Sequence, residues 1–480
     1  MTKRIAGAVL ALGALLAGCS ADELTIPNYN NPTPESVAAD PAAVQYAVNG
    51  VLGQNRSTYT SYVVDVGIFG REGYNYYPTD ARFVSHYLIQ SPLDPAGFAV
   101  PSWATRYRNL RNLFNLEQSI EASTTLTAAQ KSGALGFIGT MYALELHYVI
   151  AQVHDAGAPV EVTADPREVM PFVSRDSVYN YIIGRLNESY AQLGQGGASF
   201  PFQLHEGFNS FGDFDTPAGF AEFNRALAAR VEAWRASLRN PACGANGTTC
   251  YTNALTALTN SFLDPAGDLD AGVYHIFSAD NGDAENRFNA AVDPDLLAHP
   301  TLATDAPLKA GGARDDRYTS KIRTLPSPRS QTGGIPTPIG FDMYASNTSP
   351  VPMIRNEELI LLRAEARYFT GNQPGALADI NLIRTTSGGL AARGAFASEA
   401  DFITELLLQR RYSLMWEGHR WVDVRRFGRL ATLARDITSG ANTHVIHVQQ
   451  PIPQAECLFR APLSAELQCP NVQSVAIPNP

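Results

Sequence analysis

The stretch that most constrains the fold is residues 356–427, because it combines helical periodicity with start and stop signals. Its first predicted helix, over residues 357–369, has apolar side chains on one face: Leu359, Leu362, Ala366 and Phe369. Gly371 is typical of a helix end, and Pro374 suits the first turn of the next helix. Two helices joined by so short a turn pack antiparallel. The stretch therefore predicts a helical hairpin.

A third helix is predicted after a Gly/Ser-rich break. Ser398 and Asp401 match a capping box at its start, and Gly418 interrupts the pattern before residues 421–427 continue it. The end of this stretch is rich in charged residues, among them Glu417, Arg420, Asp423 and Arg425. Side chains three or four positions apart on a helix face each other and form ion pairs. We therefore expect these four to form a structural salt-bridge cluster rather than a ligand site.

Three motifs in this stretch resemble the C-terminal signature of the SusD/RagB family: A-E-A with a following Gly, A-x-x-x-I-N-x-I-R, and W-E-G-H-R-W-V-D-V-R-R-F-G. The matching residues are Ala364, Glu365, Ala366, Gly371, Ala376, Ile380, Asn381, Arg384, Glu417, Gly418, Arg420, Trp421, Asp423 and Arg425. Gln409 and Ser413 stand where the family often has Glu, and Ser387 begins a turn that is usually Arg-Ala-Gly-Leu.

Members of this family are outer-membrane lipoproteins that bind nutrients for a TonB-dependent transporter. The resemblance implies a mainly α fold of TPR-like helical repeats, a SusD-like α-α superhelix with a large loop-rich insertion and few short strands. It also implies an oligosaccharide or similar nutrient as ligand, a SusC-like TonB-dependent transporter as partner, no cofactor and no catalytic activity. Two alternatives are a helical-repeat adaptor that binds only protein, and a peptide-binding relative of the same architecture.

The N-terminus has the features of a lipoprotein signal. Lys3 and Arg4 precede an apolar run that is short for a membrane span, and the run ends in Leu-Ala-Gly-Cys. This resembles a bacterial lipobox, so residues 1–18 are predicted to be a signal peptide and Cys19 the site of lipid attachment. Residues 19–34 are polar and contain three prolines, as a tether would. The expected location is the outer membrane, exposed at the cell surface.

The rest of the chain, residues 35–480, is predicted to form a single SusD-like domain in three parts. Residues 35–262 carry helices in pairs, residues 264–352 are an insertion rich in Gly, Pro, Asp and Asn, and residues 353–480 hold the family signature. Helices are expected over residues 103–121, 128–153, 176–193, 220–238 and 251–262. Short extended pieces in the insertion are Val273–Phe277 and Tyr318–Ile322.

Four cysteines remain after Cys19, and an even number in an exported chain suggests disulfides. Of the three possible connectivities, Cys243–Cys250 with Cys457–Cys469 closes the shortest loops. Zinc binding is the alternative, but no C-x-x-C or paired-His spacing accompanies these cysteines. Acidic turns near Asp268 do not follow the EF-hand pattern, and no metal site is predicted.

The net charge and the absence of certain motifs argue against two classes of function, nucleic-acid binding and glycoside hydrolysis. The formal net charge is −10 and no basic stripe is evident, which argues against nucleic-acid binding. Glycoside hydrolysis needs two carboxylates held across the scissile bond. The acidic residues here lie in predicted loops without a hydrolase motif, so we expect a binding protein and no enzyme.

The best candidate site is the segment of residues 69–87, which is rich in tyrosine. Aromatic rings cover the flat faces of sugars, and polar side chains bind their hydroxyls. The candidates are Arg71, Tyr74, Asn75, Tyr76 and Asp80. Alternate residues of an extended segment face opposite sides. Tyr74 and Tyr76 are therefore expected to face the ligand and Tyr77 the scaffold, unless these tyrosines all pack on helices. A second candidate is the group Phe208, Asn209 and Phe211.

Overall fold

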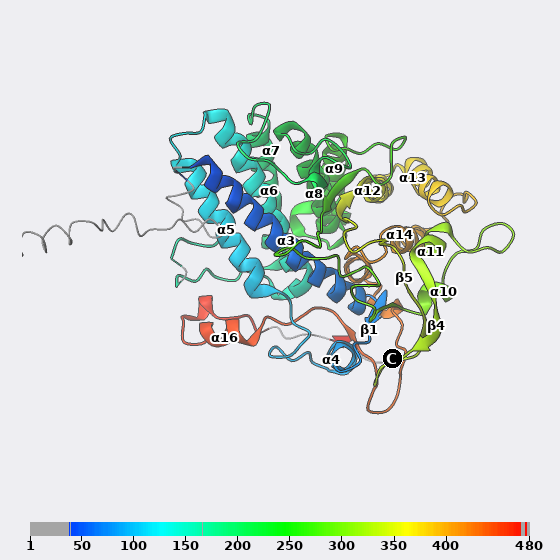
Figure 1. The fold of residues 1–480 in the computed structure, drawn as a ribbon. Coiled ribbons are helices and arrows are strands. Elements are labelled where there is room, and N and C mark those ends of the chain that lie inside the picture. The colour runs from blue at the N-terminus through cyan, green and yellow to red at the C-terminus, as the bar shows by residue number, and fades with distance from the viewer. Residues whose placement is uncertain (1–37, 39, 166, 472–475, 478–480) are drawn as a thin grey trace, which may run out of the picture.

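The computed structural model describes residues 38, 40–165, 167–471 and 476–477, and most of this length is helical (Figure 1). The predicted signal peptide, Cys19 and the tether lie outside the described residues. The described helices of seven residues or more are α3 Pro41–Phe69, α5 Trp103–Ala122, α6 Ala128–Val153, α7 Arg175–Leu193, α8 Pro217–Ser237, α9 Thr248–Thr259, α12 Asn356–Phe369, α13 Gln373–Thr386, α14 Glu399–Ser413, α15 Arg420–Arg426 and α16 Gln454–Arg460. Shorter helical turns include α4 Arg82–Val84, η2 Ser85–Ile89, η4 Glu206–Phe208, α10 Thr301–Thr304, α11 Asp316–Lys321 and η7 Leu430–Thr432.

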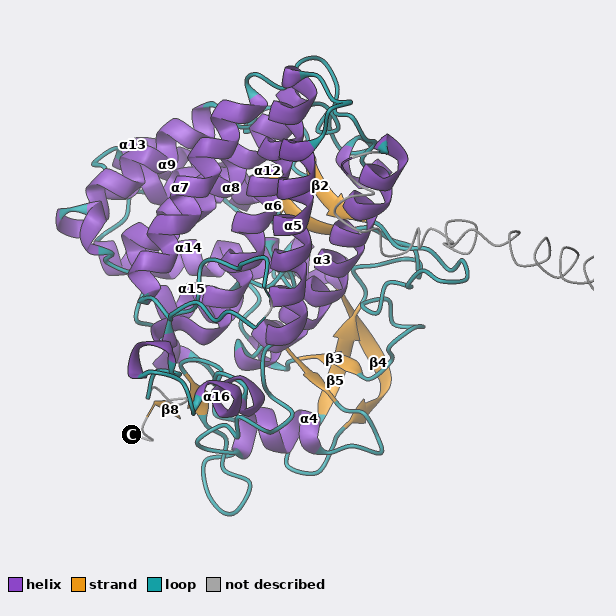
Figure 2. Cartoon of the chain, turned by 90° about the vertical axis from the view of Figure 1, so that its left-hand side faces the viewer, coloured by secondary structure: helices purple, strands orange, loops and turns teal. Residues whose placement is uncertain are grey.

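Successive helices pack against one another from α5 to α9, and α12 continues the layer beside α9 (Figures 1 and 2). The buried apolar side chains form one connected core. The predicted mainly α fold of TPR-like helix pairs is confirmed. Among the described residues, α6 with the turn that follows it is the one helix long and apolar enough for a membrane span. Its most apolar window is 94% buried inside the protein, so α6 is a core helix.

The strands are short and form three small sheets. They are β1 Gly73–Asn75, β2 Gly272–His275, β3 Leu296–Ala298, β4 Ile322–Arg329, β5 Thr337–Phe341, β6 Val351–Arg355, β7 Ile446–His447 and β8 Ala476–Ile477. The four-stranded sheet has the order β1-β3-β5-β4, with Tyr74 opposite Leu297 in an antiparallel pair. It joins the predicted site segment to the insertion of residues 264–352, below α3 in Figure 2.

The helical hairpin and the third helix of the C-terminal stretch form as predicted. Gly371 follows α12 with a φ of +89°, and the Ser398 hydroxyl accepts the Asp401 N–H at the start of α14. One short strand was predicted wrongly: residues 318–321 belong to helix α11, and only Ile322 begins a strand. The cause is a cap, because the Asp315 carboxylate accepts the Arg317 N–H and starts a helical turn.

The motif around Trp416 fixes the sheet to the helices. The buried Trp416 ring packs on Phe341 of β5 with ring centroids 4.5 Å apart. A Cβ on Gly73 of β1 would lie 2.7 Å from the same ring and 2.6 Å from the Leu297 carbonyl, so only glycine fits there. Gly418 turns the chain into α15 with a φ of +79°. The sequence thus places β1, and the segment after it, at a fixed position beneath α3.

Candidate ligand-binding surface

Tyr74 and Tyr76 share one side of the β1 segment, as alternation predicts, but that side is the interior. The two side chains are 1% and 2% exposed, and their rings stack with centroids 4.8 Å apart. The Tyr74 hydroxyl donates to the Asp436 carboxylate at 2.5 Å, and the Tyr76 hydroxyl donates to the Ile335 carbonyl at 2.6 Å. The expectation that both rings face a ligand is therefore wrong. The C-terminal segment and the β4–β5 loop, far away in sequence, cover them.

Asp436 lies at the centre of this buried contact. His299 Nε2 lies 3.0 Å from the Asp436 carboxylate, and His444 Nδ1 lies 3.4 Å from it. Burial alone would raise the pKa of Asp436, but the contacts with His299, His444 and Tyr74 outweigh burial and hold the pKa well below its usual range. Asp436 is therefore a charged acceptor that holds β1 against the C-terminal segment.

Arg71 and Asn75 were predicted to face a ligand at the surface, and this prediction is wrong. Both are buried, at 2% and 3% exposure. The Arg71 guanidinium donates to the carbonyls of Ala434, Val445 and Ile68 at 2.8–3.2 Å. A buried arginine that serves three carbonyls holds chain segments together. The two polar candidates thus belong to the scaffold beneath the surface.

The exposed part of the segment begins at Tyr77, which is 47% exposed and had been expected to face the scaffold. The Gln331 side-chain amide donates to the Tyr77 carbonyl at 2.7 Å, so the β4–β5 loop supports this residue. Tyr77 meets Phe83 edge to face with centroids 6.3 Å apart, and Phe83 meets Phe98 in the same way at 4.6 Å. Side chains from the end of the β1 segment, from α4 and from the loop that contains Phe98 therefore form one aromatic surface.

Two charged side chains lie beside these rings. The Arg82 guanidinium lies 4.8 Å from the centroid of the Phe98 ring and pairs with Asp80 at 2.6 Å. Hydrogen bonds from Arg82 hold the pKa of Asp80 at about 2, so Asp80 is a carboxylate at neutral pH. We call Tyr77, Asp80, Arg82, Phe83 and Phe98 the Tyr77 surface. Sequence analysis predicted Asp80 but missed Phe83 and Phe98, because nothing local in the sequence shows that the two rings meet.

A pocket of about 520 Å³ is lined in part by residues 92–95, which lie just before Phe98 in the sequence. Residues 92–95 form one wall, and Pro451, Ile452 and the Cys457–Cys469 disulfide form part of the other. This volume is within the usual range of ligand pockets. Asp94, Gln454 and Asn471 add polar groups to a mainly apolar lining.

The second predicted group does not form a site of its own. Phe208 is fully buried between Phe220 and Phe223, and Phe211 packs on Tyr274 with centroids 4.1 Å apart. Asn209 is exposed and donates to Asp215 at 3.1 Å. Phe208 therefore supports the core, which contradicts its predicted role at the surface.

The charged cluster of the C-terminal stretch is only partly paired as predicted. Asp423 binds Arg410 at 2.7 Å and Arg426 at 3.0 Å, and Glu417 binds Arg355 at 2.9 Å. Arg425 instead donates to the carbonyls of Val448 and Ala151. Arg420 has no ion pair among the described residues. Two of the four predicted members are thus outside the salt-bridge network. Arg425 binds backbone carbonyls, and Arg420 has no ion-pair partner in the described structure.

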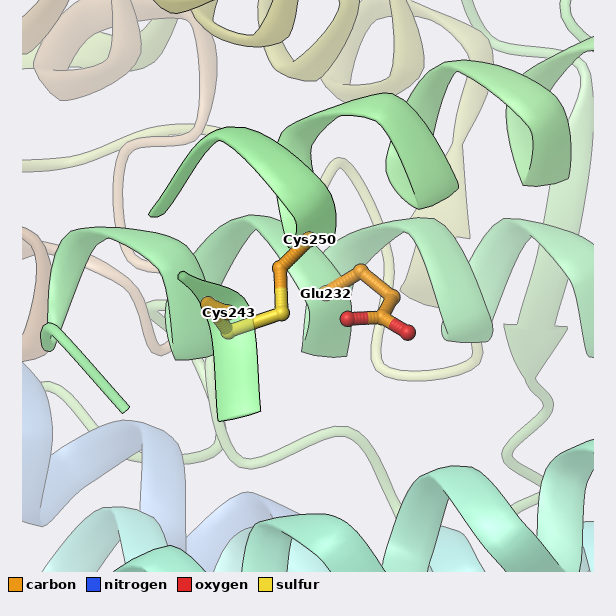
Figure 3. Close-up of side chains that lie close together, drawn as sticks. All are labelled: Glu232, Cys243 and Cys250. Atoms are coloured by element: carbon orange, nitrogen blue, oxygen red, sulfur yellow. A yellow bond between two sulfur atoms is a disulfide. The ribbon is translucent and has the colours of Figure 1, made fainter. Parts of the chain in front are cut away.

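The described residues contain one group of three potential metal ligands: Glu232, Cys243 and Cys250 (Figure 3). The two sulfur atoms are bonded to each other, and a metal requires thiolates. Cys457 and Cys469 are bonded in the same way, so the structure has the local pairing with the shortest loops. The group near Glu232 is a disulfide beside a carboxylate, and Asn253 and Arg235 bind that carboxylate.

Comparison with known proteins gives a consistent picture. Residues 337–456 match the SusD family. No curated protein sequence matches the chain. Among solved structures, Bacteroides fragilis NanU is similar at 15% identity, with 90% of this chain and 97% of that chain covered and a TM-score of 0.60. Surface glycan-binding protein A from Bacteroides uniformis is similar at 14% identity, with 88% and 98% covered and a TM-score of 0.62.

A SusD superfamily protein from Bacteroides vulgatus is also similar, at 15% identity, with 89% of this chain and 98% of that chain covered and a TM-score of 0.62. At these identities the likeness shows the fold, which extends over nearly the whole length of each relative. The C-terminal region carries the sequence signature, as the motifs predicted. Residues 337–456 are thus similar to the SusD family in sequence, and the chain is similar to SusD superfamily structures in fold.

Proposed function

We propose that this SusD-like chain is a cell-surface lipoprotein that binds oligosaccharide at the Tyr77 surface and delivers it to a TonB-dependent transporter of the outer membrane. The observation that carries the proposal is the exposed tyrosine beside a charged carboxylate–guanidinium pair, on a SusD-like fold. The name of the similar Bacteroides uniformis protein, which describes surface glycan binding, supports it. The lipobox-like sequence at Cys19 supports the anchor.

The chemistry of the surface suits a sugar. A pyranose ring has an apolar face that can stack on Tyr77, and its hydroxyls can donate to Asp80 and accept from Arg82. Because Asp80 and Arg82 bind each other, both are held in place before a ligand arrives. Such preorganisation lowers the entropy cost of binding. We propose binding without catalysis, since this surface pairs its one carboxylate with an arginine and leaves no second carboxylate among its members.

Screening of the soluble protein that starts after Cys19 against glycans and peptides tests the proposal. We expect saturable binding to at least one oligosaccharide, with loss of that binding in Tyr77→Ala. Binding to peptides alone would support the peptide-binding alternative and contradict the proposal. Binding that needs neither Tyr77 nor Phe98 would place the ligand elsewhere on the chain.

A further inference from the structure

A second pocket, of about 260 Å³, lies between α10, α14, α15 and η7. Three arginines line it: Arg411 from α14, Arg420 from the start of α15 and Arg429 from the turn before η7. One carboxylate, Asp305, lies at its edge. The chain as a whole has a formal charge of −10, so this concentration of positive charge is a local feature and no part of a basic surface.

Among the residues that the structure describes, only one of the three guanidinium groups has protein acceptors. Arg411 binds Asp305 at 2.8 Å and the Thr301 hydroxyl at 2.7 Å. Within the described structure, the side chains of Arg420 and Arg429 make no hydrogen bond or ion pair, and Arg420 Nε is buried without an acceptor. Arg420 and Arg429 are both partly buried, and a cationic group that loses water without gaining a partner is costly, so the arrangement favours an acceptor supplied from outside.

The carboxylates near Arg420 do not neutralise it. Asp423 is already bound by Arg410 and Arg426. Glu72 is fully buried, lies beyond ion-pair distance from Arg420, and accepts the Trp416 N–H. Burial raises the pKa of Glu72 to about 8, in spite of the attraction of Arg420 and Arg411, which keeps most of this group neutral at pH 7. Within the described structure, the protein therefore compensates the charge of Arg411 through Asp305 but not the charges of Arg420 and Arg429.

We propose that this pocket binds an oxyanion, the carboxylate, sulfate or phosphate group of a small ligand, between Arg420 and Arg429. Guanidinium groups present paired N–H donors whose spacing matches the oxygens of such groups. Arg411, which Asp305 and Thr301 hold in place, adds fixed positive charge at the wall. The pocket has room for an inorganic oxyanion or one acidic sugar unit. None of its residues belongs to the Tyr77 surface, so the proposal is independent of the function proposed above.

Calorimetry on the full-length protein tests this site, with sulfate, phosphate, galacturonate and neutral galactose as probes at constant ionic strength. We expect saturable binding of at least one of the three anions and none of galactose at this pocket. Binding of galacturonate without sulfate or phosphate would identify a sugar carboxylate as the source of the oxyanion, and the reverse would identify an inorganic anion. Arg420→Gln and Arg429→Gln should each weaken binding about tenfold or more, because each removes a charge-assisted contact.

Arg167→Gln is the matched control, because Arg167 is a surface arginine with an 88% exposed side chain. It should bind as the wild type does. If Arg420→Gln does not fold, as judged by its melting curve, anion binding by Arg429→Gln, which changes the neighbouring turn, tests the proposal instead. The proposal is overturned if no anion binds the wild type saturably, or if the folded pocket variants bind as tightly as the wild type.

Discussion

Glu72 is a carboxyl group that the fold keeps protonated. It is 0% exposed, one oxygen accepts the Trp416 N–H at 3.3 Å, and the other has no hydrogen-bond partner in the described structure. Burial raises its pKa from 4.5 to about 8. Between these values the unfolded chain releases a proton that the folded chain retains, so the contribution of Glu72 to stability falls as pH rises.

Glu72→Gln should remove this pH dependence. Glutamine keeps the carbonyl that accepts from Trp416 but cannot ionise. We expect the melting temperature of the variant, relative to that of the wild type, to rise between pH 5 and pH 8. Other titrating groups are common to both proteins and cancel in the difference. A difference that stays constant across this pH range would show that Glu72 ionises normally in the folded state.

Tyr74 shows which properties of a single residue can be predicted from local sequence and which cannot. Alternation along an extended segment predicts that Tyr74 and Tyr76 share a face and that Tyr77 takes the other, and the structure has this arrangement. What local sequence cannot show is which face is covered. The cover comes from Asp436 and Ile335, more than 250 positions away, so Tyr74 and Tyr76 are buried and Tyr77 is exposed, the reverse of what was expected.

Tyr74→Phe should therefore lower stability without affecting ligand binding. It removes the hydroxyl that donates to the buried Asp436 carboxylate, and the loss of such a bond costs about 1.5–3 kcal/mol. Urea unfolding of the variant measures this loss. Unchanged unfolding together with weakened glycan binding would return Tyr74 to the ligand site.

At the scale of elements, Asp423 joins three helices. From α15 it binds Arg410 of α14, and its second partner, Arg426, also binds Glu365 of α12 at 2.7 Å. Burial alone would raise the pKa of Asp423, but Arg410 and Arg426 hold it below its usual value. The four helices from residue 356 to residue 426 could be predicted because their periodicity and caps are local. The pairing of their charges could not, because partners on different helices have no fixed spacing in sequence.

Asp423→Ala should destabilise the protein by about 3–5 kcal/mol, because it leaves two buried arginines short of an acceptor. Urea unfolding gives the value. Asp165→Ala is the control: its pair with Arg167 is exposed to solvent and should contribute little. A loss of glycan binding without a loss of stability in Asp423→Ala would place Asp423 in a site and out of the scaffold.

At the scale of the whole molecule, the four-stranded sheet was not predictable. Its first strand comes from residues 73–75 and its neighbours from residues 296–341, and pairing over such distances leaves no local signal. The order of the helices and the family signature were predictable, because the signals for both lie in residues that are close together in the sequence. The position of the Tyr77 surface follows from the sheet, so sequence analysis could not show which residues of the predicted segment lie exposed.

The anchor also belongs to this scale. Cys19→Ala should remove the attachment point of every acyl chain and release the protein from the membrane fraction, since stable anchoring takes more than one chain. Metabolic labelling with a fatty-acid probe measures the modification. Undiminished label on the Cys19→Ala protein would contradict the assignment.

The central claim is that ligand recognition depends on the exposed ring of Tyr77. The most direct test is calorimetry of a bound oligosaccharide with Tyr77→Ala and with Tyr46→Ala, whose tyrosine on α3 is 45% exposed against 47% for Tyr77. A ring stacked on a sugar contributes on the order of 1 kcal/mol or more. We therefore predict a several-fold higher Kd for Tyr77→Ala, with an unchanged melting temperature, and wild-type affinity for Tyr46→Ala. Wild-type affinity in Tyr77→Ala would contradict the account.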